Sequence, residues 1–193
     1  MKAEFIYISE NRAHMLEIEV KSPCDDLRRV ERILVEKGAK LTGRRRQVDI
    51  FMSHPARDFG ATDEALRIRM EDGSGSLTYK GPKMDKDTKT REELKMDVRD
   101  VDALLLILRR LGFRESGRVE KMRTTYSIQG MTVCLDSVSD LGDFVESEYE
   151  GTDLEDGKEA VFSMMRELGL RGNERRSYLE LLLEKRMGQE PLA

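Results

Sequence analysis

Apolar and charged residues alternate along several segments of this chain. In the segment Leu16–Lys21, leucine, isoleucine and valine alternate with Glu17, Glu19 and Lys21. Because successive side chains of a β-strand point to opposite faces, such a strand has one apolar face and one charged face. One strand of this kind is also typical of an ordinary protein surface, so it decides nothing alone.

The same pattern recurs in four further segments, which carry like or paired charges two residues apart: Leu66–Met70, Arg91–Lys95, Val119–Arg123 and Phe144–Glu148. Five such strands need a shared explanation. A closed or strongly curved sheet with a charged interior supplies one. An open sheet with cross-strand ion pairs on a solvated face is the alternative, and the alternation leaves both open.

Helical spacing of apolar residues appears in four segments: about 27–37, 101–108, 154–168 and the segment after Asn173. Asp25 or Asp26 is expected to cap the first helix. We therefore predict an α+β fold, an eight-stranded antiparallel β-barrel with helices packed on its outside. The last helix should pack on its own barrel or on a second copy, which would give a homodimer. The polar segment Lys83–Thr90 is expected to be a mobile loop near the barrel mouth.

Closure of this sheet would turn the charged strand faces inward. The expected interior residues are Glu17, Glu19, Lys21, Arg67, Arg69, Lys80, Arg91, Glu93, Lys121, Arg123, Asp136, Glu146 and Glu148. Clustered cations suit a polyanion, and clustered carboxylates suit a divalent metal. Together they predict a site for a metal–polyphosphate complex.

Composition narrows the class of protein. The 193 residues include 34 Lys and Arg against 38 Asp and Glu, so the net charge is only −4, which argues against a dedicated nucleic-acid partner. The sequence has no apolar run long enough to cross a membrane. Cys24 and Cys134 are expected to be buried thiols of a cytoplasmic protein. We divide the chain into residues 1–14, an extension of uncertain origin without signal-peptide features, and one domain over residues 15–190.

An ordered series of motifs adds to this interpretation. It consists of Glu17-x-Glu19-x-Lys21, Gln47-x-Asp49-x-Phe51, Ala65–Arg69, Leu77–Pro82, Arg91-x-Glu93, Leu111-Gly112-Phe113, Lys121-x-Arg123-x-x-Tyr126, Val133-x-Leu135-Asp136-x-Val138, Leu141-Gly142-x-Phe144-x-Glu146-x-Glu148 and Ser177–Leu182. With these motifs, nearly the whole chain resembles the CYTH superfamily, or triphosphate tunnel metalloenzymes. The resemblance is greatest to the CyaB-like branch, which includes class IV adenylyl cyclases, and it implies an eight-stranded antiparallel tunnel.

The resemblance also implies a role for each charged residue. Lys21, Arg67, Arg69, Lys80, Arg91, Lys121 and Arg123 would bind a triphosphate, while Glu17, Glu19, Asp136, Glu146 and Glu148 would hold Mg²⁺ or Mn²⁺. Lys21, Lys121 and Glu146 would act in catalysis, and Glu93 would support its neighbours. For every one of these residues, a purely structural salt bridge is the alternative role.

Two reactions suit such a site. A cyclase converts ATP to cyclic AMP and pyrophosphate, and a triphosphatase hydrolyses tripolyphosphate, thiamine triphosphate or a nucleoside triphosphate. We expect the cyclase type because the overall resemblance to its branch is greater. However, Asn11-Arg12 stands where class IV cyclases carry a His-Phe pair, and Phe51 stands where some triphosphatases use a tyrosine. A non-catalytic module that binds a small-molecule triphosphate is a third interpretation.

Overall fold

The structure, a computed structural model, describes residues 16–71 and 73–188. Within this part the strands are β1 (Leu16–Pro23), β2 (Lys40–Ser53), β3 (Ala65–Glu71), β4 (Ser74–Lys80), β5 (Glu93–Val98), β6 (Arg114–Ile128), β7 (Met131–Val138) and β8 (Gly142–Gly151). The helices are α1 (Leu27–Glu36), α2 (Val101–Arg110), α3 (Leu154–Glu167) and α4 (Tyr178–Met187). The extension predicted over residues 1–14 lies outside the described residues.

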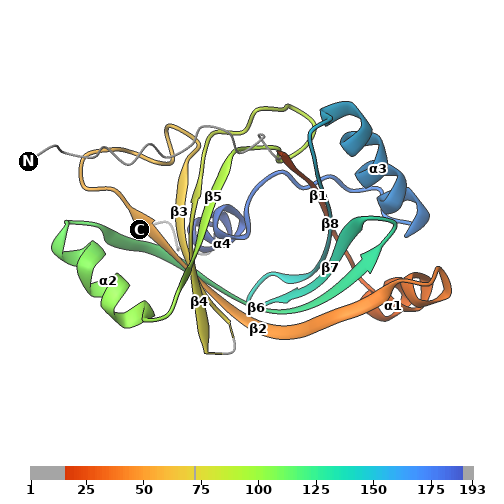
Figure 1. The fold of residues 1–193 in the computed structure, drawn as a ribbon, viewed down its shortest axis with the longest axis horizontal. Helices are drawn as coiled ribbons and strands as arrows, with labels where there is room; N and C mark the ends of the chain where they lie inside the picture. Colours follow the sequence, from red (N-terminus) through yellow and green to blue (C-terminus); the bar gives the residue numbers. More distant parts are fainter. Residues whose placement is uncertain (1–15, 72, 189–193) are drawn as a thin grey trace, which may run out of the picture.

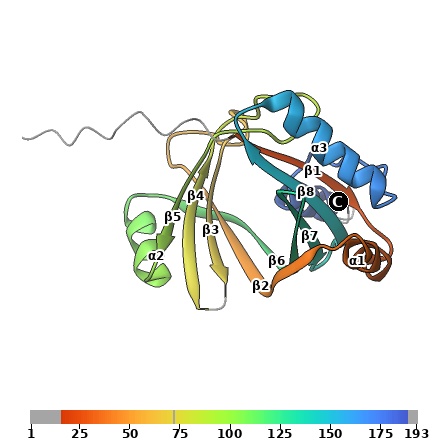
Figure 2. The same cartoon turned by 45° about the vertical axis from the view of Figure 1, so that its right-hand side comes forward.

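All the strands belong to one antiparallel sheet with the order β1-β8-β7-β6-β2-β3-β4-β5. The long strands β2 and β6 form its centre, and the sheet curls so strongly that its two halves face each other (Figures 1 and 2). The β2–β6 register shifts between Leu41 and Gly43 and between Phe51 and Met52. Because such irregularities bend a strand and raise its twist, they contribute to the curl.

The two edges of the curled sheet meet at one end. Glu17 of β1 forms an isolated antiparallel bridge with Arg91, which lies just before β5. The backbone N–H of Lys89 donates to the Glu19 carbonyl at 3.1 Å. Further along β1, the backbone N–H of Glu174 donates to the Lys21 carbonyl at 2.7 Å. The predicted eight-stranded antiparallel tunnel fold is thus confirmed, with the sheet curled into a half-barrel.

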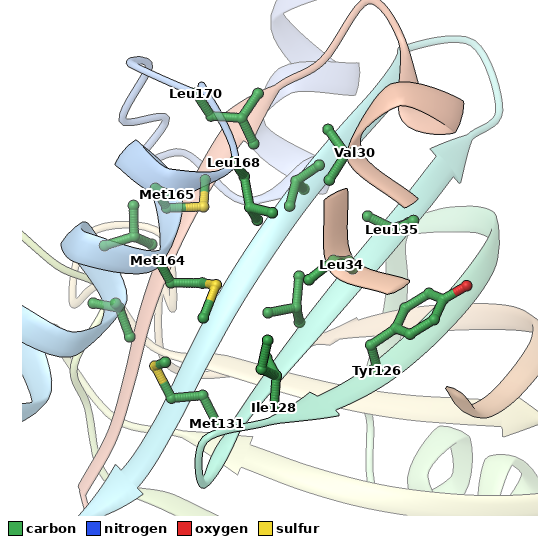
Figure 3. Packing of buried hydrophobic residues seen from close by; sticks show 14 of the residues in the cluster. Val30, Leu34, Tyr126, Ile128, Met131, Leu135, Met164, Met165, Leu168 and Leu170 are labelled. Carbon is green, nitrogen blue, oxygen red and sulfur yellow. The ribbon is translucent and has the colours of Figure 1, made fainter. Parts of the chain in front are cut away.

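The convex face of the sheet is apolar and carries three helices. Ile18, Val20 and Val145 point to this face and pack with α1 and α3. Figure 3 shows Leu34 of α1 and Met164 of α3 over the same strands. At the other end of the sheet, α2 covers a second cluster around β2 and β3. Each helix hides an apolar stripe, and burial of such side chains contributes roughly 25 cal/mol per Å² of apolar area.

The fourth helix departs from the predicted arrangement, because α4 lies in the concave side of the sheet (Figure 1). Tyr178 and Leu182 pack there with Val119, Val138 and Phe144. The helical periodicity of the sequence identified the apolar side of α4, but it did not show on which face of the sheet that side would pack. This helix packs on its own sheet, and the homodimer stays a prediction. Among the described residues, no helix has the length and hydrophobicity to span a membrane.

The loop Lys83–Thr90, expected to be mobile, is held by specific contacts. The Asp85 carboxylate accepts hydrogen bonds from the backbone N–H groups of Asp87 and Thr88, each at 2.8 Å. Lys158 of α3 lies 3.1 Å from both the Asp85 and Asp87 carboxylates. Thr88 is buried. The loop is therefore an ordered part of the barrel wall, stabilised by a turn and by contacts with α3. Both cysteines are buried and free, as predicted.

Candidate functional site

The charged concave face encloses a cavity of about 730 Å³. Its lining includes all of the predicted interior residues except Asp136: Glu17, Glu19, Lys21, Arg67, Arg69, Lys80, Arg91, Glu93, Lys121, Arg123, Glu146 and Glu148. They come from β1, β3, β4, β5, β6 and β8 and, in the case of Arg91, from the segment leading into β5. The strongly curved sheet with a charged interior is therefore the correct alternative, and the open solvated sheet is not.

Asp136 lies beneath the cavity instead of facing it. Its carboxylate is fully buried and accepts hydrogen bonds from Arg123 Nε at 2.7 Å and from the Tyr178 hydroxyl at 2.9 Å. Lys121 Nζ lies 3.5 Å away. Because its oxygens already accept these hydrogen bonds, Asp136 is placed to hold the side chains of Arg123 and Lys121 in position. Its predicted role as a metal ligand stays a prediction.

A second buried carboxylate, Asp49, holds Arg69 in the same way. Arg69 Nε and Nη2 donate to its two oxygens at 2.6 and 2.8 Å. Burial would raise the pKa of Asp49, but the hydrogen bonds and charge of Arg69 outweigh burial and depress this pKa far below its usual range. Bidentate pairs of this kind fix a guanidinium precisely in direction. The sequence motif contained Asp49, but the alternation had not placed it in the interior set.

Arg67 differs from these paired arginines. Its Nε is buried without a hydrogen-bond partner among the described residues, while Nη2 donates a long hydrogen bond of 3.5 Å to the Thr78 hydroxyl. Burial and the charge of Arg69 both lower the pKa of Arg67. A buried guanidinium with unused donors is costly unless an anion binds it. Among the predicted triphosphate ligands, Arg67 therefore has the clearest capacity for a phosphate oxygen.

Two lysines of the cavity lie near the ring of Tyr178. Lys21 Nζ donates to the Arg176 carbonyl at 2.5 Å and lies 4.0 Å from the Tyr178 ring centroid. Burial, followed by the charge of Lys89, lowers the pKa of Lys21 to about 7. Lys121 Nζ lies 4.9 Å from the same ring centroid, and burial lowers the pKa of Lys121 as well. The aromatic ring thus supports two cations whose protons are more weakly held than usual.

Three carboxylates form a separate acidic group. One oxygen each from Glu17, Glu19 and Glu148 lies within 4.8 Å of the other two. The register explains this, because Glu19 pairs directly with Glu148 between β1 and β8. Burial raises the pKa of Glu148 to about 8 and, with a contribution from Glu93, that of Glu17 to about 7. Clustered carboxylate oxygens are hard donors, which fit Mg²⁺ or Mn²⁺.

Glu146 lies outside this acidic group. It forms an ion pair with Arg123, and its carboxylate is 3.9 Å from Lys89 Nζ. Burial would raise its pKa, but Arg123 and then Lys89 outweigh burial and hold the pKa well below the usual range. Two further pairs line the wall: Lys80 with Glu93, and Arg91 Nη1 with the Gly81 carbonyl at 3.2 Å. These residues have the partners that a structural role requires, and their predicted functional roles stay predictions.

Lys89 is the clearest cavity residue that the sequence interpretation missed. Its Nζ lies 2.6 Å from the Glu19 carboxylate, so it enters the cavity beside the acidic group. Strand alternation could not find it, because Lys89 lies in a loop. Tyr178 was also missed as a site residue, since its position on a helix indicated only an apolar contact.

Comparison with known proteins agrees with this geometry. The sequence profile of the CYTH domain family matches residues 15–178. The chain belongs to the CYTH domain family. A protein of Methanocaldococcus jannaschii, named as a putative adenylate cyclase, is 38% identical over 172 residues, which cover 86% of this chain and 98% of that protein.

Solved CYTH-like structures are similar over most of their length. The PH1819 protein of Pyrococcus horikoshii OT3 is 42% identical with a TM-score of 0.81, covering 88% of this chain and 99% of that one. A protein from Hippeastrum, described as a putative adenylyl cyclase with a dominant triphosphatase activity, is 18% identical with a TM-score of 0.64, covering 92% of this chain and 97% of that one. The second likeness concerns the fold alone. The predicted family is thus confirmed, and the boundaries of the predicted domain stay a prediction.

Proposed function

We propose that this CYTH protein is a metal-dependent enzyme that acts on the triphosphate of a nucleotide, of the adenylyl cyclase type. One observation carries the proposal: Arg67, whose buried Nε has no hydrogen-bond partner among the described residues, shares a cavity with the acidic group of Glu17, Glu19 and Glu148. A cation site and an anion site in one enclosed space suit a metal–triphosphate complex. The name of the M. jannaschii relative supports the choice of reaction.

The protein's own residues would bind and orient the substrate. Arg67 would donate to phosphate oxygens, with Lys89 adding positive charge near the acidic group. Arg69 and Arg123 are fixed in advance by Asp49 and Asp136, so their charge needs no reorganisation when the substrate binds. Positioning and electrostatic stabilisation account for most catalysis of phosphoryl and nucleotidyl transfer.

Glu17, Glu19 and Glu148 would hold Mg²⁺ or Mn²⁺, which when bound would neutralise phosphate oxygens and favour departure of pyrophosphate. In the cyclase reaction, the ribose 3′-oxygen forms a bond to the α-phosphorus, and the bond from that phosphorus to the pyrophosphate oxygen breaks. The 3′-hydroxyl loses a proton. Lys21, whose pKa is about 7, is our candidate for the group that accepts it.

A triphosphatase is the second candidate, because the departure at Asn11-Arg12 weakens the argument for a cyclase. The same residues would then orient a water molecule toward the terminal phosphate, and orthophosphate would leave. The difference lies in which phosphorus is attacked. Both reactions use the same arrangement of cations and carboxylates.

Product analysis distinguishes these activities. The protein is incubated with ATP, tripolyphosphate or thiamine triphosphate in Mg²⁺ or Mn²⁺, with Glu17→Gln as the control for contaminating activity. Cyclic AMP with pyrophosphate would support the cyclase, and orthophosphate would support the triphosphatase. Retained binding without products would instead indicate a binding module and contradict both reactions.

A further inference from the structure

The cavity extends beyond its charged residues. Phe51 of β2, Phe59 of the loop between β2 and β3, and Leu179 and Leu183 of α4 line the same 730 Å³ space. We call these four residues the apolar lobe. A cavity of about 300–1,000 Å³ is typical for an organic ligand of drug size. The space therefore offers more than a charged channel for phosphates.

The side of the lobe formed by the loop is preorganised. The rings of Phe59 and His54 lie 5.7 Å apart between centroids, and His54 meets the ring of Phe113 edge-on at 5.0 Å. The Asp58 carboxylate accepts a hydrogen bond from the backbone N–H of Gly60 at 3.0 Å. These contacts hold Phe59 at the cavity wall.

The helical side of the lobe depends on close packing between α4 and β6. A Cβ atom at Gly117 would lie 2.3 Å from Leu179 Cδ1, so the absence of a side chain at Gly117 allows this approach. Leu183 follows Leu179 by one helical turn on the same face. It also lines the cavity and remains 39% exposed. The two leucines thus form an accessible apolar wall.

A free tripolyphosphate has no group that would benefit from such a wall, because it is anionic along its whole length. A flat ring would benefit, since it can stack on Phe59. The Arg57 guanidinium lies 5.7 Å from the Phe59 ring centroid and also lines the cavity. Aromatic rings and guanidinium planes are the usual stacking partners of heterocyclic bases.

We infer that the apolar lobe binds the aromatic heterocycle of a triphosphate ester, so the substrate is a nucleoside triphosphate and not free tripolyphosphate. This inference rests on the proposed function, because the charged residues must hold the phosphates. Phe59 and Leu183 determine specificity, whereas Arg67 binds the group that both compounds share.

The test compares ATP with tripolyphosphate in Phe59→Ala and Leu183→Ala, with Met187→Ala as the matched control. Met187 lies on the same helix, is 68% exposed and does not line the cavity. The KM for each compound is measured in Mn²⁺, or the Kd by calorimetry where products do not form. We expect Phe59→Ala to raise the ATP value about tenfold, since stacking on one aromatic side chain is worth about this factor. Leu183→Ala should raise the ATP value in the same direction, because it removes an apolar contact.

The tripolyphosphate value should change less than twofold, and Met187→Ala should resemble the wild type. Equal effects on the two compounds, or no effect on ATP, would overturn the inference, as would tighter binding of tripolyphosphate than of ATP by the wild type. A wild-type protein that binds neither compound would instead refute the proposed function itself.

Discussion

The ammonium group of Lys89 lies 2.6 Å from the carboxylate of Glu19, inside the cavity and beside the acidic group. A loop lysine thus partly neutralises a carboxylate that the proposed metal would share. Because both are cations, Lys89 competes with a divalent metal ion for the Glu19 carboxylate. The same positive charge favours binding of a phosphate.

Replacing Lys89 should therefore move two affinities in opposite directions. In Lys89→Ala, we expect Mn²⁺ to bind about threefold to tenfold more tightly, and the triphosphate to bind more weakly by a similar factor, because an ion pair at this depth is worth about 1 kcal/mol. Calorimetric titration of each ligand measures both values. Lys86→Ala, an exposed position in the same loop, serves as the control. A parallel change of both affinities would contradict this role.

Arg67→Ala should weaken triphosphate binding about 10-fold to 100-fold, since charged hydrogen bonds contribute about 1.5–3 kcal/mol each. The melting temperature should stay level or rise, because the variant removes a cation whose buried Nε has no hydrogen-bond partner in the described part of the chain. Arg118→Ala, at a largely exposed position of β6, should change neither value. A large loss of stability in Arg67→Ala would show that the residue is structural.

Glu148 and Glu146 should affect metal binding differently. Glu148→Gln removes a member of the acidic group, so we expect Mn²⁺ affinity to fall at least tenfold. Glu146→Gln removes the partner of Arg123, so turnover should fall while Mn²⁺ affinity changes less. Titration with Mn²⁺ by electron paramagnetic resonance measures this contrast. Equal losses of affinity would place both residues at the metal.

The stability of the metal-free protein should depend on Glu148. Its folded-state pKa is about 8, against 4.5 for the ordinary carboxyl, so the folded state holds a proton that the unfolded state has lost between these pH values. The free energy of unfolding should therefore decrease as pH rises from about 4.5 to 8. Urea denaturation in EDTA at several pH values should show that the free energy of unfolding of Glu148→Gln decreases less steeply with pH than that of the wild type. Identical pH dependence in both proteins would rule out this titration.

The hydroxyl of Tyr178 should contribute to folding. Tyr178→Phe removes the hydrogen bond to the buried Asp136 carboxylate and should lower the free energy of unfolding by about 1.5–3 kcal/mol. The ring beneath Lys21 is retained. Tyr149→Phe, for which no side-chain hydrogen bond is found among the described residues, is the matched control in urea denaturation. Similar effects of the two substitutions would contradict a specific role for the bond.

The strands and their inward residues could be predicted because a period of two assigns every second side chain to one face. That rule placed Lys21, Arg67 and Glu146 correctly in the cavity. The direct contact between Arg123 and Asp136 depends on the β6–β7 register, in which these two residues are paired. Alternation shows the face of a residue but not its partner across the sheet.

Other parts of the site depend on tertiary contacts that no local pattern records. Lys89 reaches Glu19 because a turn at Asp85 and its bonds to Lys158 fix the loop. The apolar side of α4 was visible from its spacing, yet only the assembled sheet shows that Tyr178 lies on the concave face. The sequence pattern therefore identified the site residues that lie on strands and missed those that lie on a loop or a helix.

Anomalous diffraction from crystals of the protein with Mn²⁺ and a non-hydrolysable ATP analogue tests the central claim most directly. The account predicts a manganese peak bonded to carboxylate oxygens of Glu17, Glu19 and Glu148, with a phosphate oxygen within hydrogen-bond distance of Arg67. Manganese and phosphate bound elsewhere, with this cavity empty of both, would contradict it.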